Sequence, residues 1–82
     1  MVQGGENMIL PTVSIGKKVK IKNVDRVEPT LRKRLISYGI KKDSVVCIKQ
    51  KSLFSGAYII ECEGCRIGLR KRDLMNIEVE DL

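Results

Sequence analysis

The 82-residue sequence contains no histidine and no tryptophan, and its aromatic residues are two tyrosines and one phenylalanine. Histidine is the usual general base near neutral pH and the commonest zinc ligand, so its absence argues against hydrolytic and zinc chemistry. The sequence also lacks the Gly-x-x-x-x-Gly-Lys segment that cradles nucleotide phosphates. We therefore expect a protein that is not an enzyme, has no catalytic or metal-binding residues and carries no cofactor.

Long apolar runs are absent as well. The longest, residues 8–10 and 57–60, are far below the roughly 18 residues that a membrane span requires. Residues 1–7 have neither the basic nor the apolar region of a secretory signal. These absences predict a cytoplasmic protein. The chain length allows one compact core, and we expect a flexible N-terminal tail over residues 1–7 followed by a single domain over residues 8–82.

Sixteen basic residues stand against ten acidic ones, which gives a net charge of +6. This excess favours encounter with anionic partners, although a small domain also carries such charge merely to stay soluble. The three cysteines are an odd number, and structural disulfides are rare in the reducing cytoplasm. A fold held together by disulfides is therefore not expected.

Alternating apolar and polar residues predict several strands. Between residues 18 and 22, valine and isoleucine alternate with lysine, as in a half-buried strand with a solvated lysine face. The alternation recurs over residues 45–51 and 77–79. Residues 71–74 are polar enough to form a short helical turn before the closing strand.

A helix of about three turns is predicted after the first strand. Leu31, Leu35 and Tyr38 recur at helical spacing, which would place them on one buried stripe. Pro29 suits the first turn, and Gly39 suits the left-handed residue that follows the last one.

The clearest local signal is a hairpin over residues 57–70. Two alternating runs are separated by Glu63-Gly64, a two-residue connection typical of tight hairpins. This turn would pair Cys62 with Cys65 and Glu61 with Arg66. It would also collect one apolar face, made of Tyr58, Ile60, Cys62, Cys65, Ile67 and Leu69.

About five short strands and one helix in so small a chain predict a mainly β fold with one short helix. The expected architecture is a small, partly open antiparallel barrel of the SH3-like type, with the helix between its first two strands. An OB-like barrel is the alternative.

Five segments between Leu10 and Val79 follow one another in a family-specific order: Ile-Gly-Lys-Lys-Val-Lys-Ile, Leu-Arg-Lys-Arg-Leu-Ile-Ser-Tyr-Gly-Ile, Val-Val-Cys-Ile, Ile-Gly-Leu-Arg and Ile-Glu-Val. In these segments the chain resembles the ferrous iron transport protein A (FeoA) family. Residues that match the helix of that family are Arg34, Leu35, Gly39 and Ile40.

The sequence departs from the family pattern at three places. Tyr38 stands where leucine is usual, Asp43 stands where glycine commonly makes the turn before the second strand, and residues 53–57 lack a frequent proline. The resemblance implies an SH3-like barrel and a small cytosolic accessory of the FeoB-type ferrous iron permease, whose cytosolic part is a GTPase. Such an accessory would act by protein-protein interaction.

The alternative function is that of a nucleic-acid-binding SH3-like or OB-like barrel. Barrels that bind single strands stack bases on exposed aromatic rings. Because we expect Tyr38 and Tyr58 in the core, no specific nucleic-acid binding is predicted.

Cys62 and Cys65 have the two-residue spacing of metal sites and redox pairs. A closed tetrahedral site needs four ligands, and Cys47 is the one further soft ligand in the chain. Plain packing is the favoured interpretation, and adventitious or intersubunit binding of a transition metal and a redox role remain as alternatives.

Leu53, Phe54 and Arg32 are the predicted partner-binding residues. An aromatic residue in a loop, with basic residues nearby, is typical of an interface anchor for a partner or a second copy of the chain. The alternative is that Leu53 and Phe54 fold back and cap the open end of the barrel. A regulator of a GTPase could also donate an arginine in trans, and Arg32, Arg66, Arg70 and Arg72 are candidates.

Overall fold

The computed structural model describes residues 8–52, 54 and 56–82. The strands are β1 (Met8–Ile9), β2 (Lys18–Asn23), β3 (Val45–Lys51), β4 (Ala57–Cys62), β5 (Cys65–Arg70) and β6 (Glu78–Asp81), and the helical elements are the 3-10 turn η1 (Leu10–Thr12), α1 (Pro29–Ser37) and α2 (Lys71–Leu74). The predicted tail over residues 1–7 and Leu53 lie outside the described residues.

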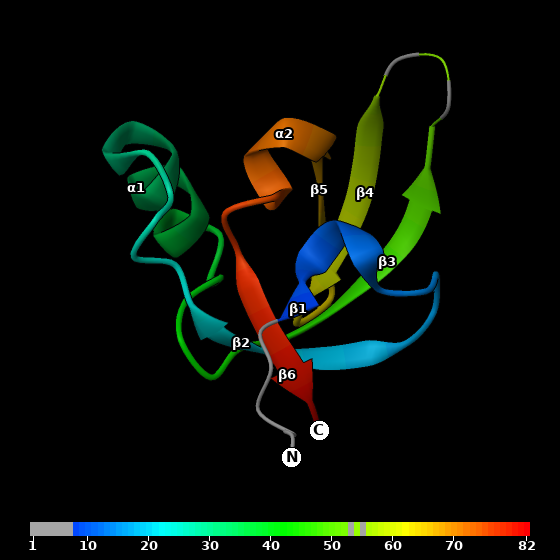
Figure 1. Cartoon of the computed structure of the whole chain (residues 1–82), viewed down its shortest axis with the longest axis horizontal. Helices are drawn as coiled ribbons and strands as arrows, with labels where there is room; N and C mark the ends of the chain where they lie inside the picture. Colours follow the sequence, from blue (N-terminus) through cyan, green and yellow to red (C-terminus); the bar gives the residue numbers. More distant parts are fainter. Residues whose placement is uncertain (1–7, 53, 55) are drawn as a thin grey trace.

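All six strands form one antiparallel sheet in the order β1-β6-β2-β3-β4-β5 (Figure 1). The sheet curls into an open barrel, and this confirms the mainly β, SH3-like fold with one short helix, inserted between β2 and β3. The strand count of five was too low, because β1 has only two residues and shows no alternation. Its pairing with β6 joins Met8 to Val79, a contact that no local pattern predicts.

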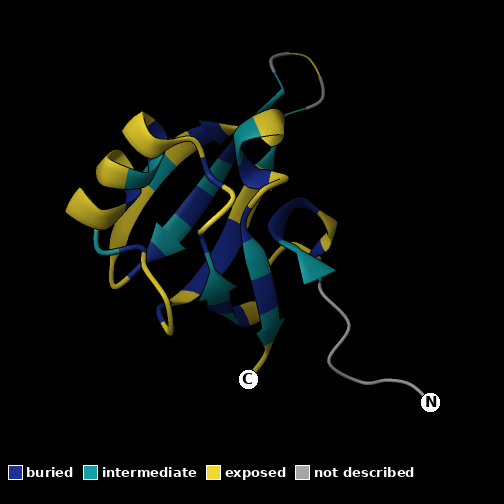
Figure 2. Ribbon diagram, turned by 60° about the vertical axis from the view of Figure 1, so that its left-hand side comes forward, coloured by how far each residue is buried: buried dark blue, intermediate teal, exposed yellow. Residues whose placement is uncertain are grey.

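The core lies on the inner face of the curled sheet (Figure 2). Apolar side chains alternate inward along β2, β3 and β4, as period two requires. The largest fully buried side chains are Leu10, Ile21, Leu35, Ile40, Ile48, Ile60, Leu74, Ile77, Val19, Val46 and Val79.

Helix α1 begins at a carboxylate cap. The side chain of Glu28 accepts hydrogen bonds from the backbone amides of Thr30 at 3.1 Å and Leu31 at 3.2 Å. These bonds favour the ionised form and lower the pKa of Glu28. Leu31 and Leu35 are buried, and the outer side of the helix faces solvent (Figure 2).

The predicted burial of Tyr38 is wrong, because its side chain is 40 % exposed. Tyr38 is the C-cap residue of α1, and the chain turns directly after it through Gly39 at φ +86°. That reversal delivers Ile40, which is 2 % exposed, to the core. The helix therefore ends at Ser37, and its last buried residue is Leu35.

The predicted register of the hairpin is confirmed from Ala57 opposite Arg70 to Cys62 opposite Cys65. Glu63 and Gly64 both have positive φ, at +51° and +83°, which is the conformation that two-residue hairpin turns require. The expectation that the whole inward row is buried is wrong, since Cys65 is exposed. Among the described strands, the end strand β5 has β4 as its single neighbour, and its turn end is exposed.

Candidate functional site

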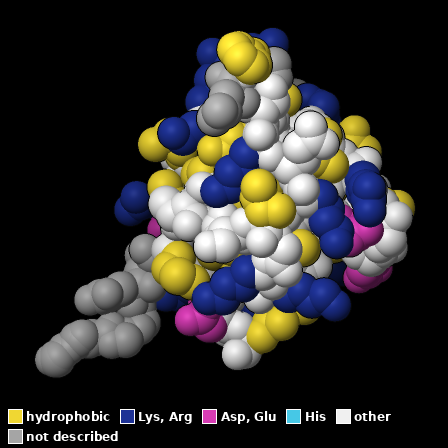
Figure 3. All heavy atoms as spheres, turned by 90° about the vertical axis from the view of Figure 1, so that its right-hand side faces the viewer, with side chains coloured by type: hydrophobic (Ala, Val, Ile, Leu, Met, Phe, Trp, Pro, Cys, Tyr) yellow, Lys and Arg dark blue, Asp and Glu magenta, His cyan; other side chains and the backbone are white. Residues whose placement is uncertain are grey.

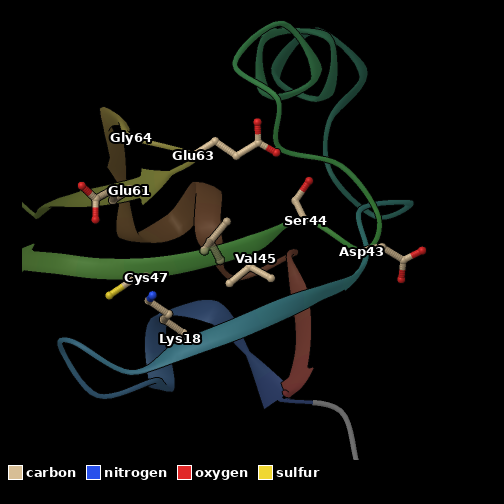
Figure 4. Close-up of a pocket in the computed structure, with 9 residues that line it drawn as sticks. Lys18, Asp43, Ser44, Val45, Cys47, Glu61, Glu63 and Gly64 are labelled. Atoms are coloured by element: carbon tan, nitrogen blue, oxygen red, sulfur yellow. The ribbon is translucent and has the colours of Figure 1, made fainter.

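A pocket of about 470 Å³ lies beside the hairpin turn (Figure 4). Three elements surround it: β2, the start of β3 with the turn that precedes it, and the β4–β5 turn. Its lining residues are Lys18, Asp43, Ser44, Val45, Val46, Cys47, Glu61, Glu63 and Gly64.

Sheet register builds the floor of this pocket. Lys18 pairs with Cys47, Cys47 pairs with Glu61, and Glu61 pairs with Arg66. Directly opposed residues share a face of an antiparallel sheet, so the four side chains form one row across β2, β3, β4 and β5. The row lies on the outer face, because the neighbouring residues Val46 and Ile60 point into the core.

Cys47 is unusual in being buried on the outer face. It is 5 % exposed, yet it does not belong to the hydrophobic core cluster. The side chain of Lys18 points toward it (Figure 4), and the thiol donates a weak hydrogen bond to the carbonyl of Ile48 at 3.7 Å. Its neighbours in the row, rather than the core, therefore keep this thiol from solvent.

The carboxylate of Glu61 is held by two cations. Lys49 Nζ lies 3.2 Å from one oxygen, and Arg66 Nε lies 3.4 Å from the other. The hydrogen bond from Lys49 is the main cause of the lowered pKa of Glu61, with the Lys49 charge and Arg66 contributing in the same direction. The predicted cross-strand pair of Glu61 and Arg66 is confirmed, and both groups stabilise the hairpin from its solvated face.

The turn that leads into β3 uses its polar groups internally. Ser44 is buried, donates a hydrogen bond to the carbonyl of Gly39 at 2.8 Å, and accepts one from the amide of Lys41 at 3.0 Å. Asp43 adopts φ +74°, a left-handed conformation in which glycine has no steric cost. Asp43 stands where the family commonly has glycine, and the backbone at this position is left-handed in this chain as well.

The two hairpin cysteines differ in their surroundings. Cys62 is 2 % exposed, and its Sγ lies 3.7 Å from the carbonyl oxygen of Gly39. Burial raises the pKa of the Cys62 thiol, and the nearby Glu63 and Cys65 add to the shift. A thiol with a raised pKa stays protonated near neutral pH, and the thiolate is the form that attacks electrophiles or binds metals.

Within the part of the chain that the structure describes, no three side chains of the metal-binding types gather into one group. Cys47 lies on the outer face, whereas Cys62 packs in the core cluster. The strands therefore do not bring Cys47 to the hairpin pair as a third ligand.

The predicted partner-binding residues lie apart. Phe54 is fully exposed in the loop between β3 and β4, so this ring does not cap the barrel. Arg32 is half-buried on α1, and its Nη1 donates to the carbonyl of Asp25 at 3.4 Å. The loop and α1 lie on different sides of the barrel in both ribbon views (Figures 1 and 2), so the two residues do not form one site.

Sequence reasoning missed the pocket and its row of side chains. The hairpin supplies Glu61 and Arg66 from adjacent segments, but Lys18 reaches Cys47 only through the pairing of β2 with β3 across α1. The alternation of lysines in β2 was the one signal in the sequence that concerned this row. It predicts which face of the sheet Lys18 lies on, but not which residue of the neighbouring strand lies opposite it.

Charged side chains are distributed over the face of the described residues that Figure 3 shows. Basic side chains are spread over the face shown in Figure 3, interleaved with apolar ones and with few acidic ones. No described helix has the length and apolar character needed to cross a bilayer.

The chain matches one family model and is similar to several solved structures. A family model described as "FeoA domain" matches residues 8–81, and a search of curated proteins found no match. The FeoA protein from Chlorobium tepidum is similar in structure, with a TM-score of 0.84 and 21 % identity over 92 % of this chain and 70 % of that one. Iron(II) transport protein A from Clostridium thermocellum has a TM-score of 0.81 and 27 % identity over 92 % of this chain and 46 % of that one.

The fold also occurs in a different functional context. A manganese-dependent transcriptional repressor has a TM-score of 0.81 and 18 % identity, over 93 % of this chain and 42 % of the repressor. At this identity the likeness concerns the fold alone.

Proposed function

This chain belongs to the FeoA family, whose membership implies a role in ferrous iron transport, and on that premise we propose that it is a small cytoplasmic accessory protein of ferrous iron uptake. It acts by binding another protein, namely a FeoB-type permease and its GTPase part. It performs no catalysis itself.

The exposed ring of Phe54 is the observation that supports a binding role most directly. A large apolar side chain that is 101 % exposed gains free energy only when a partner covers it. The base of its loop is fixed, because the amide of Ser52 donates to the carbonyl of Ala57 at 2.8 Å. Lys51 also donates to the carbonyl of Pro11 at 3.3 Å. An exposed aromatic residue on a loop whose ends are held in place is typical of an interface anchor.

The described polar groups support the absence of catalysis. Glu61 is engaged by two cations, Ser44 by two backbone groups, and Cys62 has a raised pKa. A general base or nucleophile needs a group that is poised near the working pH and free to reach substrate.

Binding to the immobilised cytosolic GTPase part of a FeoB-type permease tests the proposal, measured over a series of salt concentrations. Phe54→Ser should weaken binding by about 1 kcal/mol or more, roughly fivefold, and should leave the melting temperature unchanged. Ile36→Ser is the matched control, since Ile36 is a 52 % exposed apolar residue on α1. Absence of binding by the unaltered protein at every salt concentration would refute the proposal.

A nucleic-acid control belongs in the same experiment. Tyr38 and Phe54 are both exposed, but α1 and the β3–β4 loop lie on different sides of the barrel (Figure 1) and so offer no joint stacking platform. We expect weak binding to DNA or RNA that falls steeply as salt rises and has no sequence preference. Tight, sequence-selective binding near physiological salt would favour the nucleic-acid alternative.

A further inference from the structure

Strand β5 forms one free edge of the sheet. In the described part of the chain it pairs with β4 and with no other strand. Cys62 and Cys65 close the two-residue turn and so form a hydrogen-bonded pair, after which bonded and non-bonded pairs alternate. The N–H and C=O groups of Arg66 and Gly68 therefore point away from β4, toward the open edge. Such an edge is a template for another strand.

Space for an incoming chain lies beside this edge. A hollow of about 300 Å³ is lined by Arg34 of α1, by Ala57, Gly68, Leu69 and Arg70 of the hairpin, and by Asp73 of α2. A second hollow of about 300 Å³ is lined by Gly56 and residues 70–72. Arg70 borders both hollows.

The charges along the edge are mainly positive. Arg66 and Arg70 are exposed on the same face of β5, on either side of Gly68. Arg34, Lys71 and Arg72 add positive charge around the hollows, and Asp73 is the one acidic residue among the described residues that line them.

This charge pattern selects against a second copy of the chain. Antiparallel pairing of two β5 strands centred on Gly68 would place Arg66 of each copy opposite Arg70 of the other. Like charges directly opposite each other destabilise a strand pair. The same two arginines would each face an opposite charge if the incoming strand were acidic.

Gly68 adds a steric preference. A Cβ atom at this position would meet only the Cδ1 atom of Ile59, at an ordinary 3.7 Å. Neither crowding nor a positive φ therefore demands glycine here. Its absent side chain leaves room above the strand for a large side chain from a neighbouring strand, an arrangement known to stabilise edge glycines.

We propose that the β5 edge binds an acidic, extended segment of a partner protein as a seventh, antiparallel strand. Two carboxylate residues four positions apart face Arg70 and Arg66, and a bulky residue midway between them lies over Gly68. The inference deepens the proposed function, on which it rests, because it names the surface and the chemistry of the partner segment. Main-chain hydrogen bonds supply affinity in this binding mode, and the side chains supply selectivity.

A fluorescently labelled peptide, Thr-Glu-Thr-Tyr-Thr-Glu-Thr with blocked ends, tests the edge directly by anisotropy at about 0.1 M salt, where the Debye length is about 10 Å. Its first glutamate faces Arg70 in antiparallel pairing. Arg70→Glu should weaken binding about tenfold or more. A peptide with lysine in place of the first glutamate should bind the Arg70→Glu variant better than the unaltered protein, since it restores the opposite charge.

Lys42→Glu is the matched control, because it makes the same charge change at an exposed residue of the turn before β3. Its effect should stay below about threefold, as expected for a distant screened charge. Amide hydrogen exchange adds a structural readout, in which the Arg66 and Gly68 amides should become protected when the peptide binds.

Several results would overturn the inference: equal losses from Arg70→Glu and Lys42→Glu, no rescue by the lysine peptide, unchanged exchange at Gly68, or no binding of the unaltered protein at millimolar peptide. If the peptide does not bind but the GTPase part does, the β5 edge is rejected as the binding surface and the proposed function stands. If the peptide binds but the GTPase part does not, the FeoB-type partner is rejected and the β5 edge remains the binding surface.

Discussion

Strands β4 and β5 are paired residue by residue and have the same length and alternation, but they differ in burial. Tyr58, Ile60 and Cys62 of β4 are all buried. Their partners in β5 change along the strand, from Leu69 at 5 % exposed, through a half-buried Ile67, to an exposed Cys65. In the described part of the chain, β4 lies between two strands, whereas β5 pairs with one strand and has an exposed turn end. Alternation therefore assigns a residue to a face, and the elements above that face decide its burial.

The largest effect is expected when the two isoleucines that face each other across β4 and β5 are truncated to alanine. Ile60 is fully buried, and Ile67 lies directly opposite it but is only half-buried. Ile60→Ala should reduce the free energy of unfolding by about 3 kcal/mol, as cavities in cores do, and Ile67→Ala by about 1 kcal/mol. Urea denaturation of both variants measures the difference, and equal losses would show that β5 is as well covered as β4.

Cys62 of β4 and Cys65 of β5 differ in burial in the same way at the turn end of the hairpin. Cys62→Ser should reduce stability by about 1 kcal/mol, because a hydroxyl enters a buried site, although the carbonyl of Gly39 is within its reach. Cys65→Ser should stay within about 0.5 kcal/mol, as surface substitutions usually do. The double variant should keep partner binding.

Thiol labelling checks the same point without a mutation. Cys65 should react readily with a maleimide in the folded protein, and Cys62 should react only when the protein unfolds, since it is buried and its pKa is raised. A stoichiometric metal in the purified protein, lost from the double variant, would contradict the packing interpretation.

The hairpin also shows which features could be predicted from the sequence and which could not. The hairpin register is local, because two alternating runs and Glu63-Gly64 determine it, and it was predicted correctly. The exposure of Cys65 depends on the absence of a strand beyond β5, which no property of residues 57–70 specifies. Tyr38 failed for a related reason, since periodicity placed it on the buried stripe while the turn at Gly39 ended the helix first.

The pocket and the partner-binding residues were harder to predict because they combine distant segments. Lys18 reaches Cys47 through the pairing of β2 with β3, and the sequence fixes which face each strand buries but not this register. Arg32 and Phe54 were chosen from local composition, and the fold places them on different sides of the barrel. The exposure of Phe54 was one of two alternatives that the loop sequence left open.

A smaller effect is expected where β5 carries glycine. Gly68→Val places a β-branched residue opposite Ile59, and a Cβ atom at this position would contact Ile59 at an ordinary 3.7 Å. The unfolding free energy should rise by about 0.5 kcal/mol, because glycine is unfavourable in strands and valine favourable. Thermal denaturation measures the gain. The same variant should also bind the acidic peptide more weakly, because the central tyrosine of the peptide would lose the space above Gly68. A stabilised variant with unchanged peptide affinity would show that the missing side chain of Gly68 does not contribute to binding.

The smallest expected effect concerns the ion pairs on the outer face that link β4 to both of its neighbours. Lys49 of β3 and Arg66 of β5 lower the pKa of Glu61 in the folded protein. A carboxyl with a depressed folded pKa contributes stability that is complete above its unfolded pKa, about 4.3, and that is lost as the pH falls through the folded pKa. Acidification to about pH 3 should therefore lower the melting temperature of the unaltered protein more than that of Glu61→Gln. The difference should be slight because exposed ion pairs are screened by solvent.

Glu28→Gln is the matched control, since Glu28 also has a lowered pKa but acts at the start of α1. Equal acid sensitivity of the unaltered protein and Glu61→Gln would mean that the two cations do not tie β4 to its neighbours, and that the backbone ladder and core packing hold β5 against β4.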